Sequence, residues 1–106
     1  MKFLIITRMK DTFCMVPLDR QAQIIEGNSA FVDKYRKVGV CKEIYSIPSI
    51  HGTATLWDVE SGEKGGAIFA ENPAYGFQDY EMYAVSDFDA QMKVQKEVYQ
   101  KLLGKK

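Results

Sequence analysis

The stretch that decides the fold is residues 39–85, GVCKEIYSIPSIHGTATLWDVESGEKGGAIFAENPAYGFQDYEMYAV. Two runs rich in β-branched and aromatic residues, 40–47 and 51–59, are separated by a tight turn at 48–50 and predict a hairpin. A third run of the same kind, 79–85, predicts the last strand of the sheet. Three strands are therefore expected within this stretch.

One further strand and two helices complete the pattern. Residues 3–7 form a continuous apolar run typical of a central strand, and residues 18–38 carry apolar side chains at helical spacing up to Gly39. Between the hairpin and the last strand, Ser61 can cap a short helix. Pro73 follows that helix and ends it, because the residue before a proline disfavours helical backbone. The order βαββαβ predicts a ferredoxin-like α+β fold.

The sequence also predicts an additional C-terminal helix. Apolar residues recur at helical spacing over 88–103. The length of 106 residues suits a single domain, 1–106, that includes this helix. A chain of this size buries only about two-thirds of its unfolded surface, so burial in an oligomer adds stability. We therefore expect a homodimer or a larger homo-oligomer.

Charge and cysteine spacing exclude several classes of protein. Basic and acidic residues number 14 each, so the net charge is zero and nucleic acid is not an expected partner. The apolar run at 3–6 is too short for a signal peptide or a membrane span. Cys14 and Cys41 have neither metal-ligand nor disulfide-framework spacing. They predict reduced thiols, no bound metal and a cytoplasmic location.

Alternation along the hairpin predicts which residues share a face of the sheet. A three-residue loop would place Ile47 opposite His51. One face then carries an aromatic, hydroxyl-bearing and ionisable set: Cys41, Glu43, Tyr45, Ile47, His51, Thr53, Thr55 and Trp57. The other face is smaller and mostly aliphatic, which suits packing against helices. Because the first face would expose a large apolar patch, we expect a second copy to cover it and enclose a small-molecule pocket.

Several of these features together resemble the muconolactone isomerase family. The matching features are Gly39 before the second strand, residues 57–59 (Trp-Asp-Val) with Ser61, residues 73–81, and Pro17 at a helix start. The resemblance implies a dimeric α/β barrel, often assembled into larger rings, whose C-terminal segment reaches a neighbouring subunit. It also implies a proton shift on a small lactone without cofactor or metal.

The candidate site residues follow from their chemistry. His51 is the first candidate for a general acid or base, because histidine is the side chain that ordinarily titrates near neutral pH. Glu43 is the second catalytic candidate, as a proton acceptor if the pocket buries it. Four residues are candidates for orienting and enclosing a small, partly apolar carbonyl or lactone substrate. They are Tyr45, Thr53, Trp57 and Tyr83.

Two other functions remain open on the sequence alone. Dimeric barrels of this build also include cofactor-free small monooxygenases that oxidise aromatic substrates. A non-catalytic ligand-binding or assembly module is a third possibility, and its marker would be a face filled by interlocked aromatics without a cavity. The sequence contains no glycine-rich phosphate loop and no nucleophile elbow, so no cofactor is expected.

Overall fold

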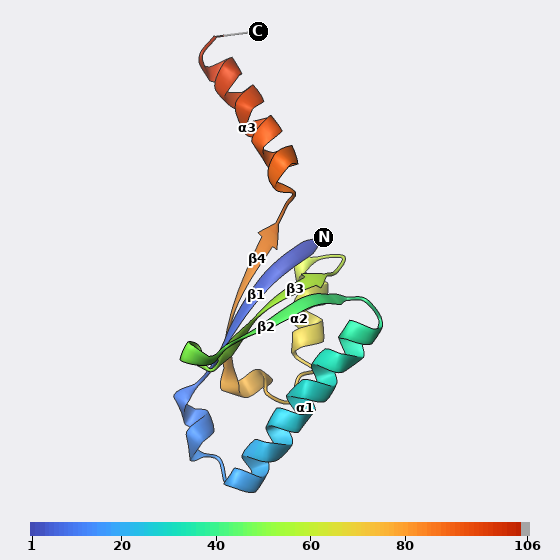
Figure 1. The fold of residues 1–106 in the computed structure, drawn as a ribbon, viewed down its shortest axis with the longest axis vertical. Coiled ribbons are helices and arrows are strands. Elements are labelled where there is room, and N and C mark those ends of the chain that lie inside the picture. The colour runs from blue at the N-terminus through green and yellow to red at the C-terminus, as the bar shows by residue number, and fades with distance from the viewer. Residues whose placement is uncertain (105–106) are drawn as a thin grey trace.

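A computed structural model describes residues 1–104 and has the predicted element order (Figure 1). Short 3₁₀ turns occupy Asp11–Met15, Pro48–Ile50 and Tyr75–Phe77. The strands and helices are β1 (Lys2–Met9), α1 (Leu18–Lys37), β2 (Cys41–Ile47), β3 (Gly52–Asp58), α2 (Gly62–Phe69), β4 (Gln78–Val85) and α3 (Phe88–Leu102). The βαββαβ order and the C-terminal helix predicted from sequence are confirmed.

The four strands form one antiparallel sheet in the order β2-β3-β1-β4. Helices α1 and α2 pack on one face of this sheet, and the part of the chain from residue 1 to 104 leaves its other face without a helix (Figure 1). This arrangement is the ferredoxin-like α+β fold. We call the second face the open face.

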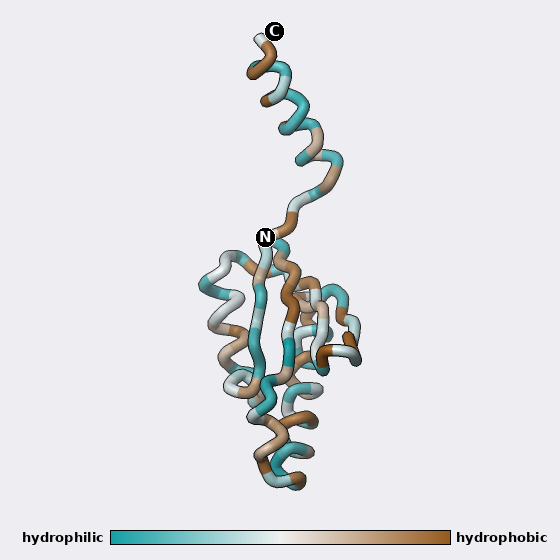
Figure 2. Tube along the Cα trace, turned by 90° about the vertical axis from the view of Figure 1, so that its left-hand side faces the viewer, coloured by the Kyte–Doolittle hydropathy of each residue, from teal (hydrophilic) through white to brown (hydrophobic). Residues whose placement is uncertain are grey.

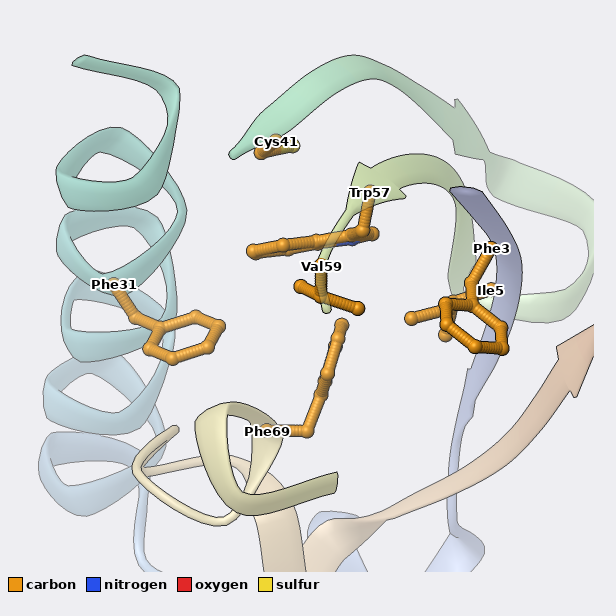
Figure 3. Packing of buried hydrophobic residues seen from close by; sticks show 7 residues of the cluster. All are labelled: Phe3, Ile5, Phe31, Cys41, Trp57, Val59 and Phe69. Carbon is orange, nitrogen blue, oxygen red and sulfur yellow. The ribbon is translucent and has the colours of Figure 1, made fainter. Parts of the chain in front are cut away.

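The core lies between the sheet and the two helices (Figure 3). Trp57 of β3 is its largest fully buried residue, with 1% of its surface exposed. Its ring packs against Phe69 of α2 at 4.9 Å and Phe31 of α1 at 6.0 Å between ring centroids. The indole N–H donates a hydrogen bond of 2.7 Å to the hydroxyl of Thr55. Aromatic packing around one tryptophan therefore joins both helices to the sheet.

Local sequence signals set the helix boundaries. Gly39 follows α1 with a φ of +76°, a left-handed conformation that glycine adopts without a Cβ clash. The Ser61 hydroxyl accepts a 3.2 Å hydrogen bond from the N–H of Lys64 and caps α2. Helix α1 continues without interruption through Gly27. A Cβ at this position would lie 2.7 Å from Cγ of Pro73. That glycine lets the loop before β4 approach the helix.

Helix α3 projects away from the sheet and the other helices, and with it the described chain measures 65 Å along its longest axis (Figure 1). Brown apolar and teal polar segments alternate along its trace in Figure 2, as expected for an amphipathic helix. Its exposed apolar residues are Phe88, Val94, Val98, Tyr99 and Leu102. Within residues 1–104, no helix is both long enough and apolar enough to cross a membrane.

The predicted division of hairpin residues between the two faces is wrong. His51 has a φ of +49° and extends the turn to four residues, so Ile47 pairs with Gly52 and not with His51. This shift of one residue places Tyr45 opposite Ala54, on the open face. An irregularity in the register between Cys41 and Glu43 then returns Cys41 to the helix-covered face, opposite Trp57.

Candidate functional site

The open face has an apolar floor with polar groups at its edges. The floor residues come from the two central strands, as the pairs Leu4–Leu56 and Ile6–Ala54 of the β1–β3 ladder. All four are partly buried even though no helix covers them in the described chain. An apolar floor with a few polar groups around it is the kind of lining that binds a small organic molecule.

A tyrosine and a glutamate pair on each outer strand of this face. On β2, the Tyr45 hydroxyl donates to the Glu43 carboxylate at 3.2 Å. On β4, the Tyr83 hydroxyl donates to the Glu81 carboxylate. In each pair, the hydrogen bond to the nearby carboxylate raises the pKa of the tyrosine, which therefore stays protonated. Three predicted site residues, Glu43, Tyr45 and Tyr83, thus share the open face.

His51 lies at the end of the hairpin and lines a hollow of about 450 Å³. Its backbone accepts a hydrogen bond of 3.0 Å from the N–H of Met9, and its own N–H donates to Pro48, so the turn holds it in place. The hollow joins the hairpin turn to the segment that follows β1. Its lining is Arg8, Met9, Lys10, Asp11, Phe13, Cys14, Ser49, Ile50 and His51.

Arg8 links this hollow to the open face. Together with Ile50 it also lines a neighbouring hollow of about 220 Å³, which includes Ile6, Asp79 and Glu81. Arg8 pairs with Asp79 in the β1–β4 ladder, next to the ion pair of 3.8 Å between Lys10 and Asp79. The His51 hollow and the open face are therefore neighbouring parts of one candidate site, with cationic groups at their junction.

Thr53 and Trp57 do not belong to this site, which corrects the sequence prediction. The Thr53 hydroxyl is 2.8 Å from the hydroxyl of Thr7, and both side chains face the helices. Trp57 is a core residue, as described above, and forms no wall of the open face. The four-residue turn is the cause, because it reverses the faces of β3 relative to β2.

The sequence prediction missed several residues of the site, among them the charged residues Arg8, Lys10 and Glu81. Arg8 follows the apolar run of β1, and its alternation with Thr7 could have placed it on the open face. Nothing local in the sequence indicates that it lines one hollow with His51 and another with Glu81. That placement depends on the pairing of β1 with both β3 and β4.

The candidate site gathers ionisable groups of several kinds. Among residues 1–104, no three histidine, cysteine, aspartate or glutamate side chains are grouped so that they could hold a metal ion. The groups gathered at the candidate site are one imidazole, cations, carboxylates and phenols. Such groups can bind an oxygenated molecule and move its protons.

The fold and the site define the class of protein: a ferredoxin-like α+β domain with a ligand-sized hollow at the end of its open face. The fold itself is that of muconolactone isomerase, to which the chain is similar with a TM-score of 0.73 and 17% identity, over 82% of this chain and 90% of that one. It is also similar to 5-chloro-2-hydroxyhydroquinone dehydrochlorinase from Burkholderia phenoliruptrix AC1100, solved with 2,5-dihydroxybenzoquinone. There the TM-score is 0.65 and the identity 10%, over 85% of this chain and 98% of that one.

The sequence comparisons add no family assignment. No protein-family model matches the chain, and no curated protein matches it. The predicted muconolactone isomerase-like fold is confirmed by structure, and at these identities the similarity shows the fold alone.

Proposed function

We propose that this protein is a cofactor-independent isomerase that moves a proton on a small lactone or carbonyl compound. One observation carries the proposal: the chain's only histidine lines a hollow of about 450 Å³ beside Arg8 and Lys10. Histidine is the side chain best suited to accept and return a proton near neutral pH. The adjacent cations can stabilise the negative charge that develops on a carbonyl oxygen.

The proposed reaction uses groups on this chain alone. The imidazole of His51 removes a proton from the carbon next to the substrate carbonyl, which forms an enolate. Arg8 stabilises the enolate oxygen, and the protonated imidazole returns the proton to another carbon, so a double bond moves without net gain or loss of atoms. Tyr45 and Tyr83 line neither hollow, and each would reach only a substrate that extends along the open face, where Glu43 and Glu81 would position the two phenols.

The substrate class is supported by the two similar structures. Their names identify a lactone isomerase and a dehydrochlorinase of a chlorinated hydroquinone, and the second was solved with a dihydroxybenzoquinone. Each name denotes a small oxygenated molecule. A compound of this size fits the two neighbouring hollows at the end of the open face.

We further propose that the protein is a homodimer in which a second copy covers the open face. Tyr45 and Tyr83 are 62% and 50% exposed there, and both lie beside the apolar floor. Helix α3 exposes a second apolar surface, which the neighbouring subunit would bury. A monomer rarely leaves two such surfaces in water.

A cytoplasmic location fits the two cysteines. Both are free, and Cys14 is exposed. An exposed thiol persists in a reducing compartment and tends to be oxidised outside the cell.

The proton-transfer proposal is tested by hydrogen exchange at carbon. Muconolactone is incubated with the protein in D₂O, and NMR measures deuterium entry at its carbon positions. The variant is His51→Asn, because asparagine tolerates the left-handed backbone of residue 51 and lacks a titrating ring. Loss of the general base should lower the exchange rate by about 10²–10⁴-fold. Ser49→Ala, in the same hollow, is the control and should keep the rate.

Exchange that persists unchanged in His51→Asn would refute the assigned base. If a panel of lactones and conjugated carbonyl compounds shows no exchange with the unmodified protein either, the isomerase proposal fails. Circular dichroism of both variants checks that the fold is kept.

The dimer is tested by sedimentation at micromolar concentration. Tyr45→Asp places a charge on the open face and should shift the protein toward the monomer. Lys42→Asp changes an exposed residue at the β2 irregularity and should leave the mass unchanged. A monomeric unmodified protein would contradict the proposal.

A further inference from the structure

Helix α3 stands away from the sheet and the other helices (Figure 1). Met92 is half-buried, and every other residue of the helix is exposed. The helix has 15 residues, and an isolated helix of this length is only marginally stable in water. Packing of its apolar face against another surface would stabilise it.

The apolar residues of α3 have the spacing of a helix that pairs with another helix. Steps of four, three, four and three residues connect five positions along it. Side chains at such steps form one stripe, and a second helix covers such a stripe by interlocking its own side chains. We call this stripe the α3 seam. Its residues are Phe88, Met92, Gln95, Tyr99 and Leu102.

The two sides of α3 differ in polarity. Val94 and Val98 lie next to the α3 seam and are 53% and 48% exposed. The opposite side of the helix carries Lys93, Glu97 and Gln100. A helix with this division has one side suited to water and one suited to packing. The α3 seam and the two valines are therefore the surface to be covered.

The rest of the described chain offers no surface as long as the α3 seam. An apolar hollow of about 370 Å³ lies near the start of β1, with Met1, Val40, Val59 and Ile68 in its lining. The 15 residues of α3 span about 22 Å, and the seam runs over that whole length. A hollow of this volume holds only a few side chains. A second copy of α3 has the same length and the same stripe.

Charge favours an antiparallel arrangement of two such helices. Asp87 caps α3 and Asp89 lies in its first turn, whereas Lys101 lies in its last turn. Antiparallel pairing sets the acidic beginning of one helix beside the basic end of the other, and it also opposes the two helix dipoles. Parallel pairing would place like charges together at both ends.

Gln95 sets the register of the antiparallel pair. It is the one polar residue of the α3 seam and lies midway between Phe88 and Leu102, seven residues from each. In an antiparallel pair the two copies of Gln95 meet at the centre, where each amide can donate to the other and accept from it. A shifted register would set each amide against an apolar side chain. A single polar residue in a seam fixes register in this way.

We propose that two copies of this protein associate through an antiparallel pair of their α3 helices, centred on Gln95. The pair specifies what covers α3 in an assembly of this chain. It rests on neither the isomerase proposal nor the open-face dimer. Because a pair of helices of this length is a small interface, it needs a higher protein concentration than the open-face dimer.

Disulfide cross-linking tests the pair. Cys14→Ser is the background variant, because it removes the exposed native thiol and leaves the buried Cys41. Helix axes about 8–10 Å apart bring facing Cα atoms within the separation that a disulfide spans, about 4.4–6.8 Å. In a glutathione redox buffer, Gln95→Cys should therefore form a linked dimer on a non-reducing gel. Glu97→Cys, on the charged side of α3, should link at least 10-fold more slowly.

Leu102→Cys tests the direction of the pair. In the antiparallel arrangement the two copies of residue 102 lie about 20 Å apart, so this variant should also link at least 10-fold more slowly than Gln95→Cys. A parallel pair would bring the two copies of residue 102 together and link them.

Val98→Asp and Gln100→Asp test which side of α3 is covered. Both place the same residue in the helix, so its lower helix propensity affects both variants equally. In the Gln95→Cys protein, Val98→Asp should slow cross-linking at least 10-fold, because it puts a charge beside the α3 seam. Gln100→Asp should leave the rate unchanged. Circular dichroism checks that the variants keep the fold.

Three results overturn the proposal. They are a Gln95→Cys link no faster than that of Glu97→Cys, a Leu102→Cys link as fast as that of Gln95→Cys, and an equal effect of the two aspartate variants. His51→Asn and Tyr45→Asp should both keep the link at raised protein concentration. Failure of the isomerase assay or of the open-face dimer therefore leaves the α3 pair standing, and failure of the α3 pair leaves both other tests valid.

Discussion

Replacing Thr55 by valine tests whether the helix-covered face is the true core face. The Trp57 indole N–H donates to the Thr55 hydroxyl at 2.7 Å, and both residues are buried. Thr55 in turn donates to the backbone carbonyl of Ile5 at 3.3 Å. Valine has nearly the shape of threonine and lacks the hydroxyl. The substitution therefore leaves the indole N–H buried without a partner and changes the packing little.

The expected cost follows from that orphaned donor. A buried polar group that loses its only partner destabilises a protein by about 1–3 kcal/mol. For a domain of this size, each 1 kcal/mol lowers Tm by roughly 4–8 °C. Thermal unfolding followed by circular dichroism measures the shift. Thr12→Val makes the same chemical change at an exposed residue and should alter stability by less than about 0.5 kcal/mol.

Tryptophan fluorescence gives a second readout, because Trp57 is the only tryptophan in the sequence. Its fluorescence should be that of a buried indole and should not change when the protein is diluted. A Thr55→Val variant as stable as the unmodified protein would refute the hydrogen-bond argument. If dilution instead produced the emission of an exposed indole, Trp57 would lie at a subunit interface and not in the core of one chain.

Three further predictions concern the backbone and the carboxylates. Gly39→Ala should destabilise the fold by about 1 kcal/mol in chemical unfolding, because alanine is strained at a φ of +76°. The Tyr35 hydroxyl donates to Glu71 at 2.8 Å and lowers the pKa of that carboxyl below its ordinary 4.5. The stability that the ionised Glu71 carboxylate adds to the fold is complete above pH 4.5, and it is lost as the pH falls through the lowered pKa of Glu71. Glu71→Gln should therefore reduce the acid sensitivity of unfolding. Glu43→Gln should lower the pKa of Tyr45 toward 10.0 in an ultraviolet titration, because the carboxylate that raises it is removed.

Short-range signals in the sequence were sufficient for the elements of the fold. Helical spacing in 18–38 predicted α1, and Ser61 predicted the start of α2. Gly39 was predicted to end α1, because glycine has no Cβ and adopts the left-handed conformation found there. Each of these signals acts over a few residues, so no knowledge of the tertiary structure is needed to interpret it.

The candidate site was predicted only in part. His51, Glu43, Tyr45 and Tyr83 were named, and the last three share the open face. Thr53 and Trp57 were placed on the wrong face, because the predicted turn was one residue too short. A strand alternates with a period of two, so an error of one residue exchanges its two faces completely.

By itself, the sequence determined the order of elements, the fold class and the presence of a single histidine in the hairpin turn. The tertiary structure decided which side of the sheet the helices cover, and it brought Arg8 and Glu81 to one end of the open face. Local propensity cannot supply this information, since both faces of the hairpin carry apolar residues. The choice follows from packing: the helices bury Trp57 and the aromatic residues around it, and the smaller Ala54 and Leu56 are left to form the open face.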